Sequence, residues 1–300
     1  MREPHPLVST QTAPIPRTWL KRACRQQSGT FSLTSCSTAV SCAGGTSDSE
    51  ALPADVAAQL LRAMAAAGDA AELAQLLQLY PDTPNAASRG TGTTALMEAA
   101  RYGREACVAA LLAGGADPNA VTHSGLPALL LASGAGHAGC VEALLQGGAD
   151  PNAADKLGST AAHAAVANGD FKCLRALLAG GADPHARDAK GRTPLHCCST
   201  KQPDEALCVQ LLLAAGSDPN MPDSEGKTAL HRSSGRHGCL ETVLLLLAAG
   251  ADPNAAGADQ VAQLCSLPTV LHRLDMTSPA RPPLSNRCRE THTAAHRGIL

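Results

Sequence analysis

The chain has 300 residues, with 24 Lys or Arg against 26 Asp or Glu, so its formal net charge is −2. A slightly acidic chain does not suit the phosphate backbone of a nucleic acid as its main ligand. The longest apolar runs, such as residues 106–113, fall far short of the ~18 residues that a membrane-spanning helix needs. We therefore expect a soluble protein without a membrane span, and we do not expect a nucleic acid as its main partner.

The N-terminal segment differs from the rest of the chain in composition. Residues 1–47 carry five Lys or Arg against a single Glu, many Ser and Thr, and no periodicity. Acid-poor, hydroxyl-rich leaders are typical of organellar transit peptides, but the same composition is typical of plain disorder. We interpret residues 1–49 as a disordered leader, and keep transport to a plastid or mitochondrion through residues 1–47 as the alternative.

A five-residue phrase, Gly-Ala-Asp-Pro-Asn or a close variant, recurs along the chain at steps of 33, 33, 35 and 34 residues. A fixed period of this size indicates that each unit buries its apolar face only against its neighbours, which defines a solenoid. The phrase begins at Gly115, Gly148, Gly181, Gly216 and Gly250.

Each unit contains a second glycine, which suits a hairpin tip that requires a positive φ. An Asp three residues earlier can close the tip by an Asx-type turn onto its own backbone. These glycines are Gly92, Gly125, Gly158, Gly191 and Gly226, and the Asp residues are Asp155, Asp188 and Asp223.

Two helices follow each predicted tip. Thr193 and Pro194 are typical of a helix start, and we expect the first helix to run for about ten residues. Paired leucines three and four residues before the recurrent phrase, such as Leu144 and Leu145, predict a second helix with one buried stripe. The repeating unit is therefore hairpin, helix, turn, helix.

These motifs resemble those of the ankyrin-repeat family, as the hairpin and helix signature at 191–196 and the phrase at 216–220 show most clearly. The resemblance covers about 91–255 in five repeats, with departures at Pro127, Met97 and Leu130. It implies an all-α repeat solenoid of stacked helix-turn-helix units with β-hairpin or turn tips. Within residues 50–275, we expect an N-terminal capping repeat at 54–86 and a C-terminal cap at about 256–275. A disordered basic tail is expected at 276–300.

Twelve cysteines and several recurrent histidines could indicate a metal site or disulfides. Stacked helices lie ~8–10 Å apart, whereas a disulfide requires Cα atoms ~4.4–6.8 Å apart, and no Cys-x-x-Cys pair occurs. We expect reduced core cysteines at Cys107, Cys140, Cys173 and Cys208, an intracellular location in the cytoplasm or nucleus, and no metal or cofactor. The resemblance implies a structural role, bridging hairpins, for His163, His196 and His231.

The sequence contains no recognisable catalytic motif, and the Gly-Lys-Thr at 226–228 lacks the upstream glycine of a phosphate-binding loop, because Met221 occupies that position. We therefore expect no enzyme and no small-molecule substrate, but a monomeric scaffold that binds another protein. The alternatives are a substrate adaptor or regulatory subunit of a larger enzyme complex, for example a ubiquitin ligase, and a nucleic-acid-associated factor.

In the family, partners bind the concave face formed by hairpin tips and first helices. The inter-helix segments at 199–205 and 233–238 are a second candidate surface. The candidate partner-binding residues on the tips and first helices are Glu98, Arg101, Tyr102, His123, Lys156, Arg187, Asp188, Lys190, Asp223, Glu225 and Arg232.

Overall fold

The structure is a computed structural model that describes residues 53–198, 204–234, 240–253 and 255. The leader, the cap expected at 256–275 and the tail at 276–300 lie outside the described residues, as does most of the inter-helix segment at 199–205. The predictions made for these segments therefore remain predictions.

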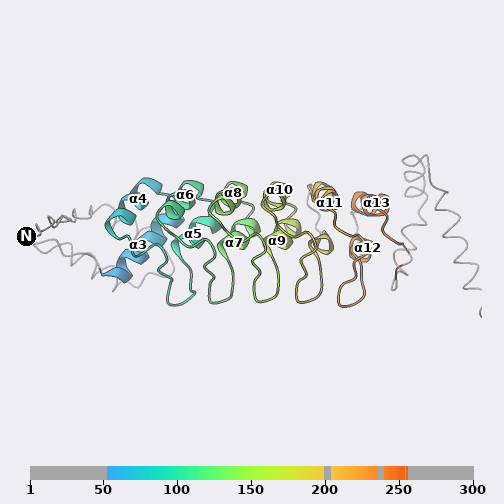
Figure 1. Cartoon of the computed structure of the whole chain (residues 1–300), viewed down its shortest axis with the longest axis horizontal. Helices are drawn as coiled ribbons and strands as arrows, with labels where there is room; N and C mark the ends of the chain where they lie inside the picture. Colours follow the sequence, from blue (N-terminus) through green and yellow to red (C-terminus); the bar gives the residue numbers. More distant parts are fainter. Residues whose placement is uncertain (1–52, 199–203, 235–239, 254, 256–300) are drawn as a thin grey trace, which may run out of the picture.

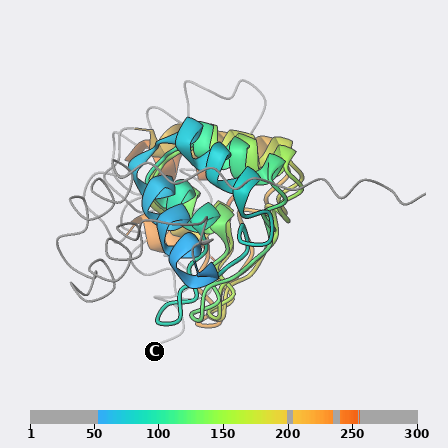
Figure 2. The ribbon, with the colours of Figure 1, turned by 90° about the vertical axis from the view of Figure 1, so that its left-hand side faces the viewer.

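The described helices occur in pairs that stack in one row, and looped tips project from one edge of that row (Figure 1). In Figure 2, which looks along the row, successive pairs and their tips overlie one another. The pairs are α3 (Ala54–Ala67) with α4 (Ala70–Leu79), α5 (Ala95–Arg101) with α6 (Glu105–Ala113), α7 (Ala128–Gly134) with α8 (Ala138–Gln146), α9 (Ala161–Ala167) with α10 (Phe171–Ala179), the 3-10 helix η1 (Pro194–Cys197) with α11 (Glu205–Ala214), and α12 (Ala229–Ser234) with α13 (Leu240–Ala248).

We number the last five pairs, each with the tip that precedes it, as repeats one to five; α3 and α4 precede repeat one. The tips are residues 88–92, 121–125, 154–158, 187–191 and 222–226, and together they form what we call the tip edge. Within the described residues the tips contain only isolated β-bridges, Val121 with Pro127 and Ala154 with Thr160. The all-helical repeat solenoid with turn tips is thus confirmed.

Both glycine series adopt a positive φ, as the sequence predicts for the tip glycines. Gly158, at a tip, has φ 72°, and a Cβ there would lie 3.1 Å from the backbone nitrogen of Ala189 in the next repeat, so a larger residue would push neighbouring tips apart. Gly181, just past the end of α10, has φ 90°. A third series, which our sequence analysis missed, turns the chain between the two helices of repeats one to three at Gly103, Gly136 and Gly169.

The first helices are shorter than the ten residues we predicted. α5, α7 and α9 have seven residues each and α12 has six, because the third glycine series already turns the chain in repeats one to three. In repeat four the first helix is reduced to the four-residue η1, and Cys198 follows it with an extended ψ of 89° that ends the helix.

The core follows the stripe that the sequence predicts. Leu144 and Leu177 are fully buried, and the four recurrent cysteines are at most 2% exposed. Their burial in the core cluster confirms their role in core packing, and all four are free thiols in the structure. Burial raises the pKa of Cys140 to about 11 and that of Cys208 to about 12, so both stay protonated near neutral pH. Within the described ranges, no helix is both long and apolar enough to cross a membrane.

Candidate functional site

The tips of repeats three to five are closed by the carboxylates that the sequence predicts. In repeat four, Asp188 Oδ1 accepts hydrogen bonds from the backbone N–H groups of Lys190 (2.9 Å) and Arg192 (2.8 Å). In repeat five, Asp223 Oδ1 accepts from Glu225 and Lys227, both at 2.9 Å. The Asx-type closure is therefore confirmed, and these tips are stiffened by their own side chains.

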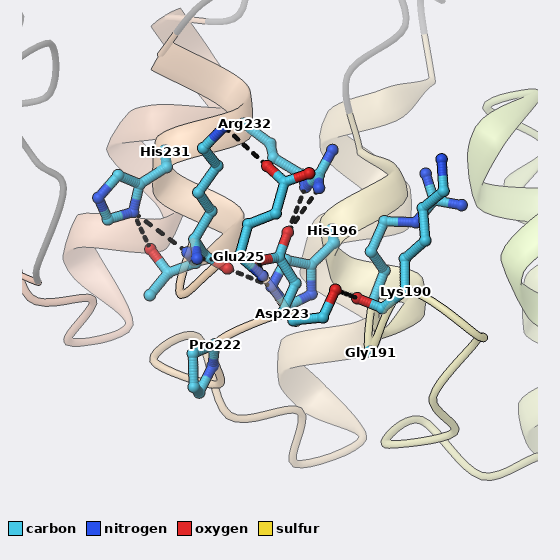
Figure 3. Close-up of polar contacts among 12 residues, drawn as sticks. Lys190, Gly191, His196, Pro222, Asp223, Glu225, His231 and Arg232 are labelled. Carbon is cyan, nitrogen blue, oxygen red and sulfur yellow. Dashed lines mark hydrogen bonds and ion pairs between the residues drawn. The ribbon is translucent and has the colours of Figure 1, made fainter.

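The second oxygen of each of these carboxylates pairs with an arginine of the same repeat. Arg192 Nη2 lies 2.6 Å from Asp188 Oδ2, and Arg232 donates to Asp223 Oδ2 (Figure 3). Burial opposes ionisation of both carboxyls, but the hydrogen bonds from the arginines and the backbone outweigh it and hold each pKa below its ordinary value.

These contacts affect two of the candidate partner-binding residues. Asp188 and Asp223 are only 9% and 5% exposed, so they add little exposed charge to the tips. Their carboxylates turn inward because the free N–H groups of the tip and an arginine are the stronger partners. Arg232, a third candidate, is itself half-buried against Asp223.

Two recurrent histidines connect neighbouring repeats. His163 Nδ1 lies 3.2 Å from the backbone nitrogen of Thr160, and its Nε2 lies 2.9 Å from the carbonyl oxygen of Arg192 in the next repeat. His196 makes the same two contacts, to Thr193 N (3.1 Å) and to Lys227 O (3.1 Å). The bridging role that the resemblance implied is confirmed for both.

The partners of each ring determine its protonation state. A backbone N–H can only donate, so Nδ1 must be the acceptor and the proton must lie on Nε2, which donates to the carbonyl. A second proton would place two donors face to face. Consistent with this, burial lowers the pKa of both His163 and His196.

The basic candidates on the tips remain at the surface. Lys156 Nζ donates to the carbonyl oxygen of His123 in the preceding repeat (2.7 Å). Arg187 donates to its own tip at Gly191 O (3.1 Å) and to Pro222 O of the next tip (2.7 Å). The side chains of Lys156, Arg187, Lys190 and His123 are exposed, and so is Glu225, which pairs with Lys227 at 2.9 Å.

The candidates on α5 form a separate group. Arg101 and Tyr102 are exposed at the end of this helix, and the guanidinium of Arg101 lies 6.0 Å from the centre of the Tyr102 ring, close enough for a cation–π contact. Glu98 is half-buried. Because α5 belongs to repeat one, the structure does not bring these residues together with the candidates of repeats four and five.

Three exposed tip residues with basic or large apolar side chains were missing from our candidates. Arg89 lies on the tip of repeat one, three residues before Gly92, at the position that Asp188 and Asp223 occupy in their own repeats. Val121 and Leu157 are 54% and 68% exposed. Their place in the repeat register was the signal that could have found them.

The sequence analysis also missed a series of asparagines that bridge consecutive turns. Asn152 donates from Nδ2 to the carbonyl oxygen of Gly181 (3.3 Å), and its Oδ1 accepts from the backbone N–H of Asp183 (2.7 Å). Asn85, Asn119 and Asn220 make equivalent pairs of contacts. In repeat three the equivalent residue is His185, so the Asn bridge to repeat four is missing.

Across the described residues, no three His, Cys, Asp or Glu side chains gather in a way that could hold a metal ion. The pKa shifts described above have structural causes. Those of the tip carboxylates come from tip closure and ion pairing, and those of the histidines and cysteines come from burial.

Taken together, stacked helix pairs with stiff tips define a helical repeat protein. A model of ankyrin repeats, present in three copies, matches residues 60–155, 129–223 and 162–256. The chain therefore belongs to the ankyrin-repeat family. No curated protein matches it at a significant level. Ankyrin repeats are generally protein–protein interaction modules, and proteins built from them are typically non-catalytic.

Proposed function

We propose that this chain binds another protein through its tip edge. The observation that carries the proposal is that every neighbouring pair of tips is linked by a hydrogen bond. Backbone bonds join His123 N to Thr91 O (3.0 Å), Ala189 N to Leu157 O (2.8 Å) and Ser224 N to Lys190 O (2.9 Å). Lys156 Nζ links the remaining pair.

Linked tips support binding because their backbone is already ordered. A partner that docks on them would immobilise side chains but would not have to order loops, which lowers the entropic cost of association. The same edge exposes Val121 and Leu157, two large apolar side chains in solvent, among charged groups. Apolar contacts surrounded by charge are the usual composition of a protein interface.

The finer alternatives remain predictions. An adaptor or regulatory role would depend on segments outside the described residues, and the described residues contain nothing that favours a nucleic acid over a protein. The monomeric state and the cytoplasmic or nuclear location are likewise predictions.

Site-specific photo-crosslinking in cells would test this proposal. A photoreactive amino acid replaces Leu157 or Ser224 on the tip edge, or Glu142 or Gln210, which are exposed on α8 and α11. We expect adducts with one partner protein from the two tip positions and not from the two helix positions. Adducts from the helix positions alone would place the interface elsewhere and contradict the proposal.

A further inference from the structure

The acidic residues of the tips contribute little free negative charge to the tip edge. Asp188 and Asp223 each neutralise an arginine of their own repeat and are turned away from solvent. Glu225 is exposed, but it is paired with Lys227. Asp155 is half-buried and caps its own tip. The acidic residues of the tips are therefore occupied within the protein.

The basic residues of the tips are not neutralised in this way. Arg89, Lys156, Arg187 and Lys190 are exposed, and within the described residues none of them pairs with a carboxylate. Lys156 and Arg187 contact only carbonyl oxygens, which do not cancel their charge. The tips of repeats one, three and four each present uncompensated positive charge, although the whole chain has a net charge of −2.

A row of exposed acidic residues lies away from the tips. The turns that follow the second helices each expose one aspartate. The tip edge and this row of aspartates run parallel along the solenoid, because each repeat contributes one tip and one such turn. These aspartates are Asp117, Asp150, Asp183, Asp218 and Asp252.

We propose that the tip edge recognises an acidic segment of a partner protein that also carries apolar side chains. This inference rests on the proposed function and specifies the partner. The basic side chains of the tips attract the acidic groups, and complementary charge gives selectivity and fast encounter. Val121 and Leu157, exposed among these cations, supply contacts that a purely charged ligand could not use.

The composition of the tips favours a peptide over a nucleic acid. Single-stranded nucleic acids are bound by basic grooves with aromatic side chains on which bases stack. The five tips contain no aromatic residue of the Phe, Tyr or Trp type. The flanking segments of this chain are also poor occupants, because residues 1–52 and 256–300 each carry five Lys or Arg against three Asp or Glu.

The repeat spacing suggests how the acidic segment is arranged. Packed helices lie ~8–10 Å apart, and each tip precedes one helix pair of the stack, so we expect a similar distance between neighbouring tips. A polyproline II segment rises ~3.1 Å per residue and turns once every 3 residues, so every third side chain lies on one face ~9 Å from the next. Carboxylates spaced by multiples of three residues could therefore lie opposite the tips, including the basic tips of repeats one, three and four.

The test uses the full chain and a fluorescein-labelled peptide of about 15 residues, three for each tip, with Glu at every third position and Leu and Ser between. Binding is followed by fluorescence anisotropy at about 50 mM and about 300 mM salt. The test variant combines Arg89→Glu with Lys190→Glu, because both side chains are exposed and make no hydrogen bond in the described structure. The matched control combines Lys172→Glu with Arg175→Glu, both exposed on α10.

We expect the tip variant to lose at least about tenfold in affinity at low salt and less at high salt, while the control stays within about twofold. Replacing the peptide's Leu by Ser should also weaken binding. Circular dichroism and an unchanged thermal midpoint establish that both variants are folded. Equal losses in both variants, or undiminished binding by the tip variant, would overturn the inference.

Two further outcomes would assign the tips to another ligand and would also overturn the inference. The first is tighter binding of an RNA oligomer of equal charge. The second is self-association that the tip variant abolishes. A tip crosslink to a partner whose bound segment is not acidic would preserve the proposed function and overturn only the acidic specificity.

Discussion

Repeats one and two are joined to their successors differently from repeats three and four. At the histidine position of the first helix, repeats one and two have Met97 and Leu130, whereas repeats three and four have His163 and His196, each bonded to a carbonyl of the next repeat. The turns show a different pattern. Repeats one, two and four have the Asn bridge, and repeat three has His185 instead.

The comparison shows that two kinds of hydrogen-bonded bridge join neighbouring repeats in one stack: a histidine bridge from the first helix and an Asn bridge in the turn. Repeats one and two combine an apolar residue on the first helix with an Asn bridge in the turn. Repeat three has the opposite combination, and repeat four has both. The interface between repeats three and four therefore lacks the Asn bridge and has the His163 bridge, tip contacts such as Ala189 N to Leu157 O at 2.8 Å, and one turn contact in which Ser217 Oγ donates to Pro184 O at 3.4 Å.

The largest difference in stability between two equivalent substitutions should occur at the carboxylates that close the tips. Asp223→Ala leaves Arg232 and two backbone N–H groups without their partner, so we expect a loss of about 2–3 kcal/mol. Asp155→Ala removes a similar closure in repeat three but no arginine pair, and should cost about 1 kcal/mol. Urea unfolding measures both. Equal losses would mean that the Arg232 ion pair contributes nothing.

The tip carboxylates also show the limits of prediction from sequence. The Asx-type closure was predictable because it depends on residues two and four positions along the chain. The second partner of Asp223 was not, because Arg232 lies nine residues away and reaches it only after α12 has formed. The sequence therefore predicted the shape of the tips. Their surface charge could be determined only from the side-chain contacts in the structure.

A similar limit applies to the repeat elements. The repeat period, the buried cysteines and the histidine bridges were predictable, because each depends on residues that recur at a fixed position in the repeat. The reduction of the first helix to η1 was not visible, because Thr193 and Pro194 are an ordinary helix start. The partner-binding role of the tip residues remains a proposal, since it depends on a molecule outside this chain.

At the Asn bridges, we expect a smaller difference in stability between equivalent substitutions. Asn152→Ala removes two hydrogen bonds between repeats two and three, so we expect a loss of about 1–2 kcal/mol. His185→Ala at the equivalent position of repeat three removes no such bridge and should stay within about 0.5 kcal/mol. Thermal and urea unfolding provide the comparison. A large loss from His185→Ala would show that this histidine has a role of its own.

The histidine bridges should make the second part of the stack sensitive to acid. An unfolded histidine takes up a proton near pH 6.5, whereas burial lowers the pKa of His163 and His196 in the folded protein. The unfolded state therefore gains protons first, and stability should fall as the pH decreases below about 6.5. Leu at both positions, as at Leu130, should flatten the pH dependence between about 6.5 and 5. An unchanged slope would contradict this assignment.

The smallest expected effect is a gain in stability from a new bridge at the interface between repeats three and four. His185→Asn should restore the missing bridge, with Nδ2 directed to the carbonyl of Gly216 and Oδ1 to the backbone N–H of Asp218, by analogy with Asn152. Because these groups are exposed, we expect a gain in stability of about 0.5–1 kcal/mol, which raises the thermal midpoint by roughly 1–4 °C for a domain of this size. The reciprocal Asn152→His should lower the midpoint. If His185→Asn gives no gain, the turn of repeat four lies too far from repeat three for an asparagine to reach, and its longer spacing from the preceding turn would be the cause.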